Sequence, residues 1–189
     1  MGQSAKTAIG GILTGLSIII LMPTIFGIFV YALPLIASAL ILFSVIELGR
    51  KWAFGIYAAV SILGLLLIPN KEAVVYYVAF FGYYPIVKSY LESKNMPRLL
   101  EFFLKMLVFN VSMILAVTIL TKAFGMPIEV IFDTEGKTGF YAKYAALIFL
   151  IAGNIVFPFF DYFALTQYVN FYLSFLQKKL RKLFPFIGK

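Results

Sequence analysis

The sequence predicts an all-α polytopic membrane protein with six transmembrane helices, and three observations indicate this fold class. Of the 189 residues, 62% are hydrophobic and only 13% are charged, which is more apolar surface than a soluble domain can bury. The apolar runs are long and continuous, unlike the alternating segments of about 10 residues that build a membrane β-barrel. Most basic residues lie in short segments beside these runs, as is typical of membrane topology.

The apolar runs define the predicted helices in order. Each run approaches or exceeds the roughly 20 residues that a helix needs to cross the bilayer. Arg50 and Lys51 make a tight basic turn between spans two and three, and Gly82 and Pro85 interrupt span four. We expect the first run to be a span and not a cleaved signal sequence, because no small-residue cleavage site is evident before the second run. The first five spans cover 7–26, 31–49, 52–68, 73–90 and 99–124, and the sixth begins near 140.

The distribution of basic residues predicts the orientation. Six spans place both ends on one side, and a cytoplasmic N-terminus leaves 12 of the 16 basic residues inside and 4 outside. Because short cytoplasmic loops carry the excess of Lys and Arg, this orientation is favoured. The prediction is therefore a multi-pass protein of a bacterial cytoplasmic (inner or plasma) membrane. Both termini are cytoplasmic, and the acidic segment 125–139 is an external hairpin that can fold over one face.

Two interpretations describe the end of the chain, because the run 140–175 is too long for one simple crossing. In the preferred one, residues 1–160 form the six-helix bundle and 161–189 form an amphipathic basic helix and tail on the inner surface. Asp161 would begin that helix, where a carboxylate is favourable, and the KKLRK sequence would bind anionic lipid. The alternative is one long, tilted helix. The expected polar stripe of the surface helix consists of Thr166, Asn170, Ser174, Gln177 and Arg181.

Composition excludes several kinds of chemistry. The chain contains no Cys and no His, so thiolate nucleophiles, disulfides and His bases or ligands are absent. The only two Asp residues are Asp133 and Asp161, and no phosphate-binding GxxxxGK[ST] loop occurs. We therefore expect no enzyme activity, cofactor, metal or nucleic-acid partner. Glu101 and Lys105 are expected to pair across one helical turn as a structural anchor.

Five polar side chains within the apolar runs are candidate ligand-binding residues. Tyr76, Tyr77 and Tyr83 belong to the aromatic fourth span, where a buried hydroxyl needs a partner. Asn110 and Asn154 lie near the middle of spans five and six, where an unpaired amide is costly. Each set has a second interpretation. The tyrosines can be simple packing or interfacial residues, and the amides can bond to each other or to a neighbouring helix.

The first span carries a small-residue face made by Thr7, Gly11 and Gly15, which are four residues apart. Small residues let another helix approach closely. This face is expected either to pack against another span of the same bundle or to dock a partner protein.

This layout resembles the substrate-binding S component of energy-coupling factor (ECF) transporters. The resemblance rests on chain length, on six spans with both ends inside, and on the small-residue face of the first helix. Thr7, Gly11 and Gly15 stand where that family has an AxxxA docking motif. The resemblance implies capture of a small molecule such as a vitamin, in an outward-opening pocket lined by Tyr76, Tyr77 and Asn154 with 125–139 as a lid.

The resemblance also implies partners. A transmembrane coupling subunit and two cytoplasmic ATPases would reorient the protein and power uptake. The main alternative is a non-transporting assembly or regulatory protein that binds a partner or anionic lipid. A secondary transporter ranks third because no inverted repeat or buried carboxylate set is visible, and an enzyme ranks last. A ligand-sized cavity between spans four and six would favour transport, whereas side chains filling that region would favour an interaction protein.

Overall fold

The computed structural model describes residues 2–176, apart from the side chains at 142, 164, 175 and 176, and every element in that range is a helix. This confirms the all-α class. Four helices are long and apolar enough to cross a membrane, so the chain is compatible with a membrane protein. The predicted count of six spans is not confirmed, since the second helix is shorter and the fourth is broken. The four long helices cover Gln3–Phe26, Arg50–Leu67, Arg98–Lys122 and Lys143–Ser174.

The first three helices form one half of the core. Helix α1 (Gln3–Leu21) continues into the 3₁₀ turn η1 (Met22–Phe26), α2 covers Ala32–Glu47, and α3 covers Arg50–Leu67. The reversal between α2 and α3 occurs at Gly49, whose φ of 90° is readily accessible only to glycine. The three helices pack on one another through buried apolar side chains that include Leu13, Ala37, Ile41, Ala53, Ile56 and Val60.

The predicted fourth span is broken into three pieces. Helix α4 (Lys71–Tyr76) passes into the π-helical segment η2 (Tyr77–Phe81), and α5 (Tyr84–Glu92) begins after a turn with Pro85 in its first turn. Gly82 is required at the turn, because an added Cβ would lie 2.7 Å from a ring carbon of Tyr57. The backbone carbonyl of Val78, four residues before Gly82, accepts a hydrogen bond of 2.8 Å from the Tyr57 hydroxyl. The distortion predicted from Gly82 and Pro85 is therefore present.

The second half of the chain contains two long helices. Helix α6 covers Arg98–Lys122, the short α7 covers Ile128–Ile131, and α8 begins at Phe140 and ends at Phe159. The π-segment η3 (Phe160–Thr166), α9 (Gln167–Phe171) and the π-segment η4 (Tyr172–Leu176) follow without an intervening loop.

The end of α8 differs from the preferred sequence interpretation. The helix does not stop near Pro158 but passes through it and widens into the π-turns of η3, which accommodate a proline that cannot donate a backbone hydrogen bond. Asp161 therefore does not begin a new helix. The long-helix alternative describes residues 140–176, whereas Gln177, Arg181 and the KKLRK sequence lie outside the described residues.

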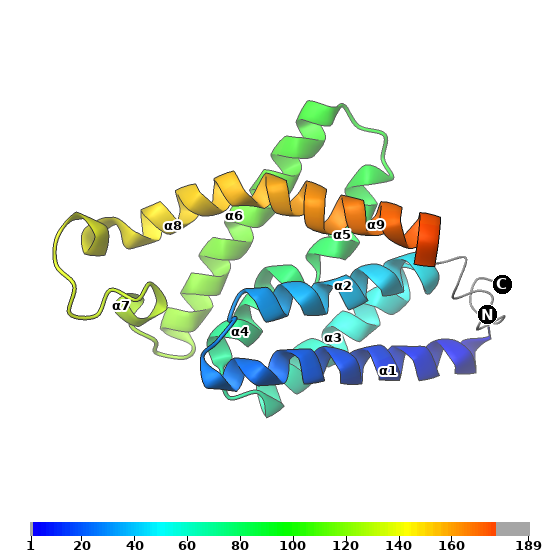
Figure 1. The fold of residues 1–189 in the computed structure, drawn as a ribbon, viewed down its shortest axis with the longest axis horizontal. Coiled ribbons are helices and arrows are strands. Elements are labelled where there is room, and N and C mark those ends of the chain that lie inside the picture. The colour runs from blue at the N-terminus through cyan, green and yellow to red at the C-terminus, as the bar shows by residue number, and fades with distance from the viewer. Residues whose placement is uncertain (1, 177–189) are drawn as a thin grey trace.

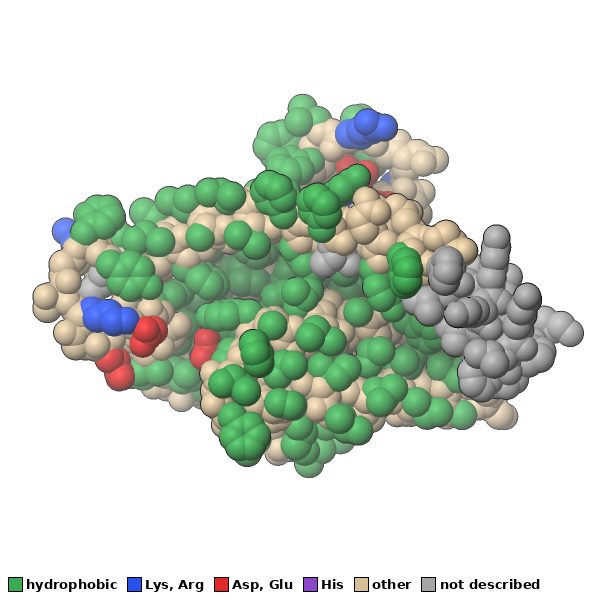
Figure 2. Space-filling view, in the orientation of Figure 1, with side chains coloured by type: hydrophobic (Ala, Val, Ile, Leu, Met, Phe, Trp, Pro, Cys, Tyr) green, Lys and Arg blue, Asp and Glu red, His purple; other side chains and the backbone are tan. Residues whose placement is uncertain are grey.

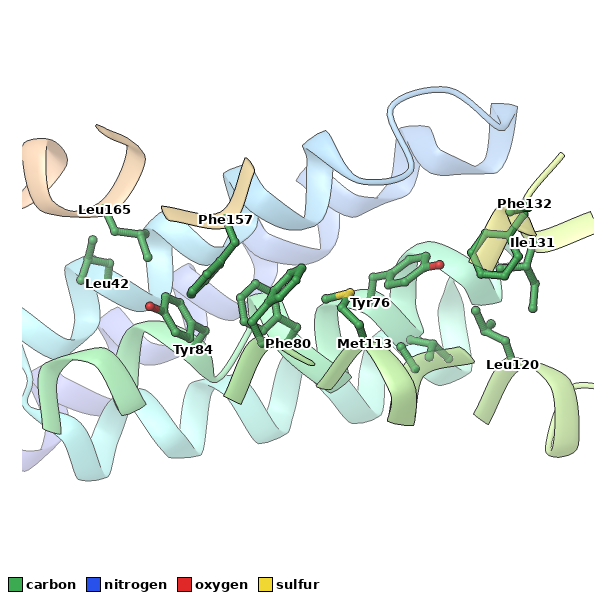
Figure 3. Packing of buried hydrophobic residues seen from close by; sticks show 14 residues of the cluster. Leu42, Tyr76, Phe80, Tyr84, Met113, Leu120, Ile131, Phe132, Phe157 and Leu165 are labelled. Carbon is green, nitrogen blue, oxygen red and sulfur yellow. The ribbon is translucent and has the colours of Figure 1, made fainter. Parts of the chain in front are cut away.

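Figure 1 shows the resulting arrangement, in which α1, α2 and the α8–η4 helix lie roughly parallel and α6 crosses behind the α8–η4 helix at a steep angle. The beginning of α1 and the end of η4 lie at one end of the molecule, and the loop that contains α7 lies at the other. A second core cluster packs along α4, η2, α6 and α8 (Figure 3). It is dominated by Tyr76, Phe80, Tyr84, Phe109, Met113 and Phe157.

Candidate functional site

A cavity of about 370 Å³ lies between α2, η2, α6 and α8. This volume is within the range of about 300–1,000 Å³ that small-molecule sites occupy. Two of the three described π-segments contribute to the wall, with Phe80 and Phe81 from η2 and Phe160 from η3. π-Turns are frequent at functional sites because they redirect side chains out of the regular helical register. The remaining lining residues are Tyr31, Ala32, Leu35, Tyr76, Phe109, Met113, Phe149, Gly153, Val156 and Phe157.

The floor of the cavity is a tightly packed aromatic group. Phe109 and Phe157 stack with ring centroids 4.8 Å apart, and Phe80 meets both rings edge to face. Gly153 makes this arrangement possible, because a Cβ at that position would lie 2.8 Å from the Phe109 ring. The rings are therefore held in fixed positions before any ligand binds, which lowers the entropic cost of binding.

Tyrosines close the end of the cavity that lies nearer to α7. The Tyr31 and Tyr76 rings lie 4.9 Å apart, and Tyr31 also contacts Phe149 of α8 at 6.1 Å. The Tyr31 hydroxyl donates a hydrogen bond of 3.2 Å to Glu72. The Tyr76 hydroxyl is fully buried and has no hydrogen-bond partner among the described residues. It points toward Phe132 (Figure 3) and is the one unsatisfied polar atom among the side chains of this wall.

Tyr84 connects the opposite end of the cavity to a group of charges. Its ring contacts Phe80 and Phe157 with centroids 4.9 and 5.3 Å away. Its hydroxyl donates a hydrogen bond of 2.6 Å to the Asp161 carboxylate. A displacement of the aromatic floor would therefore be transmitted directly to Asp161.

The charge cluster joins α5, α6 and η3 through two lysines and three carboxylates. Lys88 pairs with Asp161 at 2.7 Å and with Glu92 at 2.8 Å. Lys105 pairs with Glu101 at 2.7 Å, with Glu92 at 2.8 Å and with Asp161 at 3.2 Å. The two lysines are only 2% and 7% exposed, and buried charges persist only when they are paired in this way. The expected pairing of Glu101 with Lys105 is confirmed as part of this larger network.

The predicted tyrosines lie in different environments. Only Tyr76 lines the cavity. Tyr77 faces the other side of η2, where its ring packs against Tyr57 at 6.2 Å in the core formed by α1, α2 and α3. Tyr83 shares a hydrogen bond with Ser112 of α6. Tyr77 and Tyr83 therefore join η2 and α5 to their neighbours and do not contribute to the cavity wall.

The two predicted amides bond to each other. Asn110 of α6 donates to the Asn154 carbonyl oxygen at 2.7 Å, and Asn154 donates back at 2.8 Å. Each amide also donates to the backbone carbonyl four residues earlier in its own helix, at 2.9 and 2.8 Å. Neither residue lines the cavity, so the pair acts as a clamp between α6 and α8.

The small-residue face of α1 borders an open groove between α1 and α3. Thr7, Gly11 and Gly15 line it together with Trp52 and Gly55. No atom lies within 4 Å of a Cβ built on Gly11 or Gly15. The face is therefore not covered by another helix in the part of the chain that the structure describes.

The segment 125–139 contains α7 and packs Ile131 and Phe132 into the second core cluster. A smaller cavity of about 240 Å³ beneath it shares Tyr31 and Phe149 with the main cavity. At its exposed edge Lys137 bonds to Asp133 at 2.8 Å, and this hydrogen bond raises the pKa of Lys137 above its ordinary value. The segment therefore borders both cavities through Tyr31 and Phe149.

Sequence reasoning missed Lys88 and Glu92 as members of a site. Lys88 and Lys105 are separated from Asp161 by 73 and 56 positions, so no local spacing reveals the cluster. The available signal was a lysine within an apolar helix, four residues before Glu92, because a charge in such a helix requires paired partners. Among the residues that the structure describes, no group of three or more carboxylates is arranged to hold a metal ion.

Comparison with known proteins adds no assignment, because no family model matches the chain and no curated protein or solved structure is significantly similar to it.

Proposed function

We propose that the chain is a membrane-embedded binding subunit that captures a small molecule for uptake across a cytoplasmic-type membrane. The observation that carries this proposal is the preorganised aromatic cavity of about 370 Å³ between α2, η2, α6 and α8. A protein that only scaffolds a partner would fill this region with side chains, since an unfilled cavity costs stability. A ligand that occupies the cavity restores the missing contacts and so explains why the cavity is retained.

The proposal extends to partners. Without a phosphate-binding loop the chain requires partner ATPases, and in an ECF-type assembly a coupling subunit would dock on the groove of Thr7, Gly11 and Gly15. The open space over Gly11 and Gly15 supports this part of the proposal, because a second helix can approach there without displacing any side chain. In the proposed topology the termini are cytoplasmic and segment 125–139 is external.

A ligand-binding experiment tests the first part. The protein is purified in mild detergent, co-purifying small molecules are identified by mass spectrometry, and thermal shifts are measured with a panel of vitamins and apolar ring compounds. The proposal expects a stabilising ligand whose effect is lost in Tyr76→Ala and kept in Tyr77→Phe, because only Tyr76 lines the cavity. The proposal fails if no compound shifts the wild-type protein and no small molecule co-purifies.

A docking experiment tests the second part. Gly11→Leu and Gly15→Leu are introduced together, with Gly55→Ala as a conservative change in the same groove. Because nothing lies within 4 Å of the added Cβ atoms, the fold is expected to be retained while co-purification of an ATPase complex is lost. Unchanged recovery of that complex would show that the groove is not its docking surface.

A second candidate function is a non-transporting assembly or regulatory subunit. The same open groove favours it, since a partner helix would dock there whether or not a ligand is transported. The two candidates differ in the cavity, because a purely interacting protein would show partner binding without any stabilising ligand.

A further inference from the structure

The cavity has a side opening toward the surface of the helix bundle. One rim is formed by Ala32 and Leu35 of α2, and the other by Gly153 and Val156 of α8 and by Phe160 of η3. Figure 2 shows this face hollowed between the two helices, with hydrophobic side chains at the bottom of the hollow. The opening is therefore a slot between α2 and α8.

The slot has closed ends. At the outer end the Tyr31 ring of α2 contacts Phe149 of α8 at 6.1 Å. At the inner end Phe43 contacts Tyr172 of η4 at 5.4 Å, and the Tyr172 hydroxyl donates a hydrogen bond of 2.7 Å to Glu47. These contacts join the two long helices above and below the cavity. Access is left at the middle of the bundle, at the level of the hydrocarbon core in the proposed topology.

The surface around the slot is apolar. Ile36 on α2 is 52% exposed, Val156 on α8 is 61% exposed, and Phe163 on η3 is 62% exposed. Exposed side chains of this kind on a membrane helix face the acyl chains. A molecule that reaches the slot therefore comes from the bilayer.

The wall of the cavity also favours an apolar ligand. Among the described residues that line the cavity none is charged, and the accessible surface of the wall is made by apolar atoms. The Tyr31 hydroxyl is directed to Glu72, and the Tyr76 hydroxyl points toward Phe132 (Figure 3). A charged or highly polar ligand would lose its hydration without finding partners.

We infer that the substrate is an uncharged, apolar ring compound that dissolves in the bilayer and enters sideways between α2 and α8. This inference rests on the proposed binding function and names its substrate class. A cavity of about 150 Å³ with an aliphatic and aromatic lining binds benzene, so about 370 Å³ accommodates two or three fused rings. The stacked and edge-on rings of Phe80, Phe109 and Phe157 match the faces and edges of such a molecule.

A lipid acyl chain fits the geometry less well. An acyl chain also reaches the slot from the side, but it is flexible and would lose its conformational freedom inside the cavity. A rigid planar compound loses less, and its faces and edges match the edge-to-face and stacked rings of Phe80, Phe109 and Phe157.

Photolabelling in lipid nanodiscs tests the inference. Three diazirine probes are compared, namely an uncharged naphthyl compound, a naphthalene sulfonate that stays in water, and a phosphatidylcholine with the diazirine in its acyl chain. Labelled peptides are identified by mass spectrometry. We expect the uncharged naphthyl probe to label the peptides that contain Phe80 and Phe157, and unlabelled anthracene to compete with it. Equal labelling there by the lipid probe would identify an acyl-chain site and overturn the inference.

Two adjacent residues provide a matched pair of variants. Val156 lines the cavity and is 61% exposed, whereas Ile155 is 62% exposed and does not line it. Val156→Trp narrows the slot and is expected to reduce cavity labelling by about tenfold, while Ile155→Trp leaves it unchanged. Leu35→Trp on the opposite rim repeats the test if Val156→Trp folds poorly. Equal labelling of all three variants would show that access is not through the slot.

The outcomes separate this inference from the function on which it rests. If a water-soluble compound stabilises the protein and the naphthyl probe does not label the cavity, the binding function holds and the substrate class is wrong. If the naphthyl probe labels the cavity and no ATPase complex co-purifies, the substrate class holds and the uptake function is wrong.

Discussion

Removal of Lys88 is expected to destabilise the protein more than removal of its partner Asp161. The cluster contains two lysines and three carboxylates, so its net formal charge is −1. Lys88→Met changes this to −2 and deprives Asp161 and Glu92 of pairs at 2.7 and 2.8 Å. Asp161→Asn changes it to zero, and the new amide oxygen still accepts from Lys88.

The magnitudes follow from this difference. Breaking a buried ion pair by removing one partner costs about 3–5 kcal/mol, whereas weakening a charged hydrogen bond costs about 1.5–3 kcal/mol. For chains of about 150–250 residues each kcal/mol lowers Tm by about 2–4 °C. Lys88→Met should therefore lower Tm by about 6–20 °C and Asp161→Asn by about 3–12 °C. When both variants are measured in the same preparation, the decrease in Tm should be smaller for Asp161→Asn.

Thermal unfolding in one detergent, followed by the loss of monodisperse protein, measures both variants and their combination. The double variant Lys88→Met/Asp161→Asn restores the net charge to −1, so its loss should be smaller than the sum of the single losses. Asp161→Asn as the more destabilising single change, or strict additivity in the double variant, would refute the charge-balance reasoning.

Two further sets of substitutions test the packing of the site. Gly82→Ala should lower the free energy of unfolding by about 1–3 kcal/mol, because its Cβ would lie 2.7 Å from the Tyr57 ring. Gly55→Ala is the control and should leave Tm unchanged, because the space around Gly55 is open. Equal stability of the two variants would contradict the close packing at η2. Asn110→Leu and Asn154→Leu should each destabilise the protein. A double-mutant cycle, measured by unfolding in mixed micelles, should give a coupling free energy of about 0.6 kcal/mol between the two residues. A coupling of zero would contradict the paired amides.

Hydropathy was sufficient to predict the helical class and the approximate positions of the long helices. The all-α class and the approximate bounds of the long helices follow from long apolar runs, because any bilayer segment must satisfy its backbone internally. The break near Gly82 and Pro85 was also predictable, since proline removes a hydrogen-bond donor. Pro158 shows the limit of that rule. There the helix continues through a π-turn, within which Asp161 bonds to Lys88 and Tyr84.

The candidate site was predicted only in part. Tyr76 was recognised from its place in an aromatic helix, but which tyrosine faces the cavity depends on the π-turn η2 that follows it. The alternative in which Asn110 and Asn154 bond to each other matches the structure. The link from the cavity through Tyr84 to the charge cluster requires three segments to meet, and no sequence period encodes such contacts.

Tyr84 links the cavity to the charge cluster of α5, α6 and η3. Tyr84 touches the aromatic floor with its ring and Asp161 with its hydroxyl. A ligand that shifts Phe157 would therefore change the geometry of the cluster that joins α5, α6 and η3. In the proposed uptake function this is the route by which occupancy could be sensed at the inner end of the bundle.

A structure determined in lipid nanodiscs, with the species that co-purifies from the membrane, tests the central claim most directly. The account predicts compact, planar density against Phe80 and Phe157, in the cavity behind the slot between α2 and α8. A cavity collapsed onto its own side chains, or one filled by the acyl chain of a bilayer lipid, would contradict it.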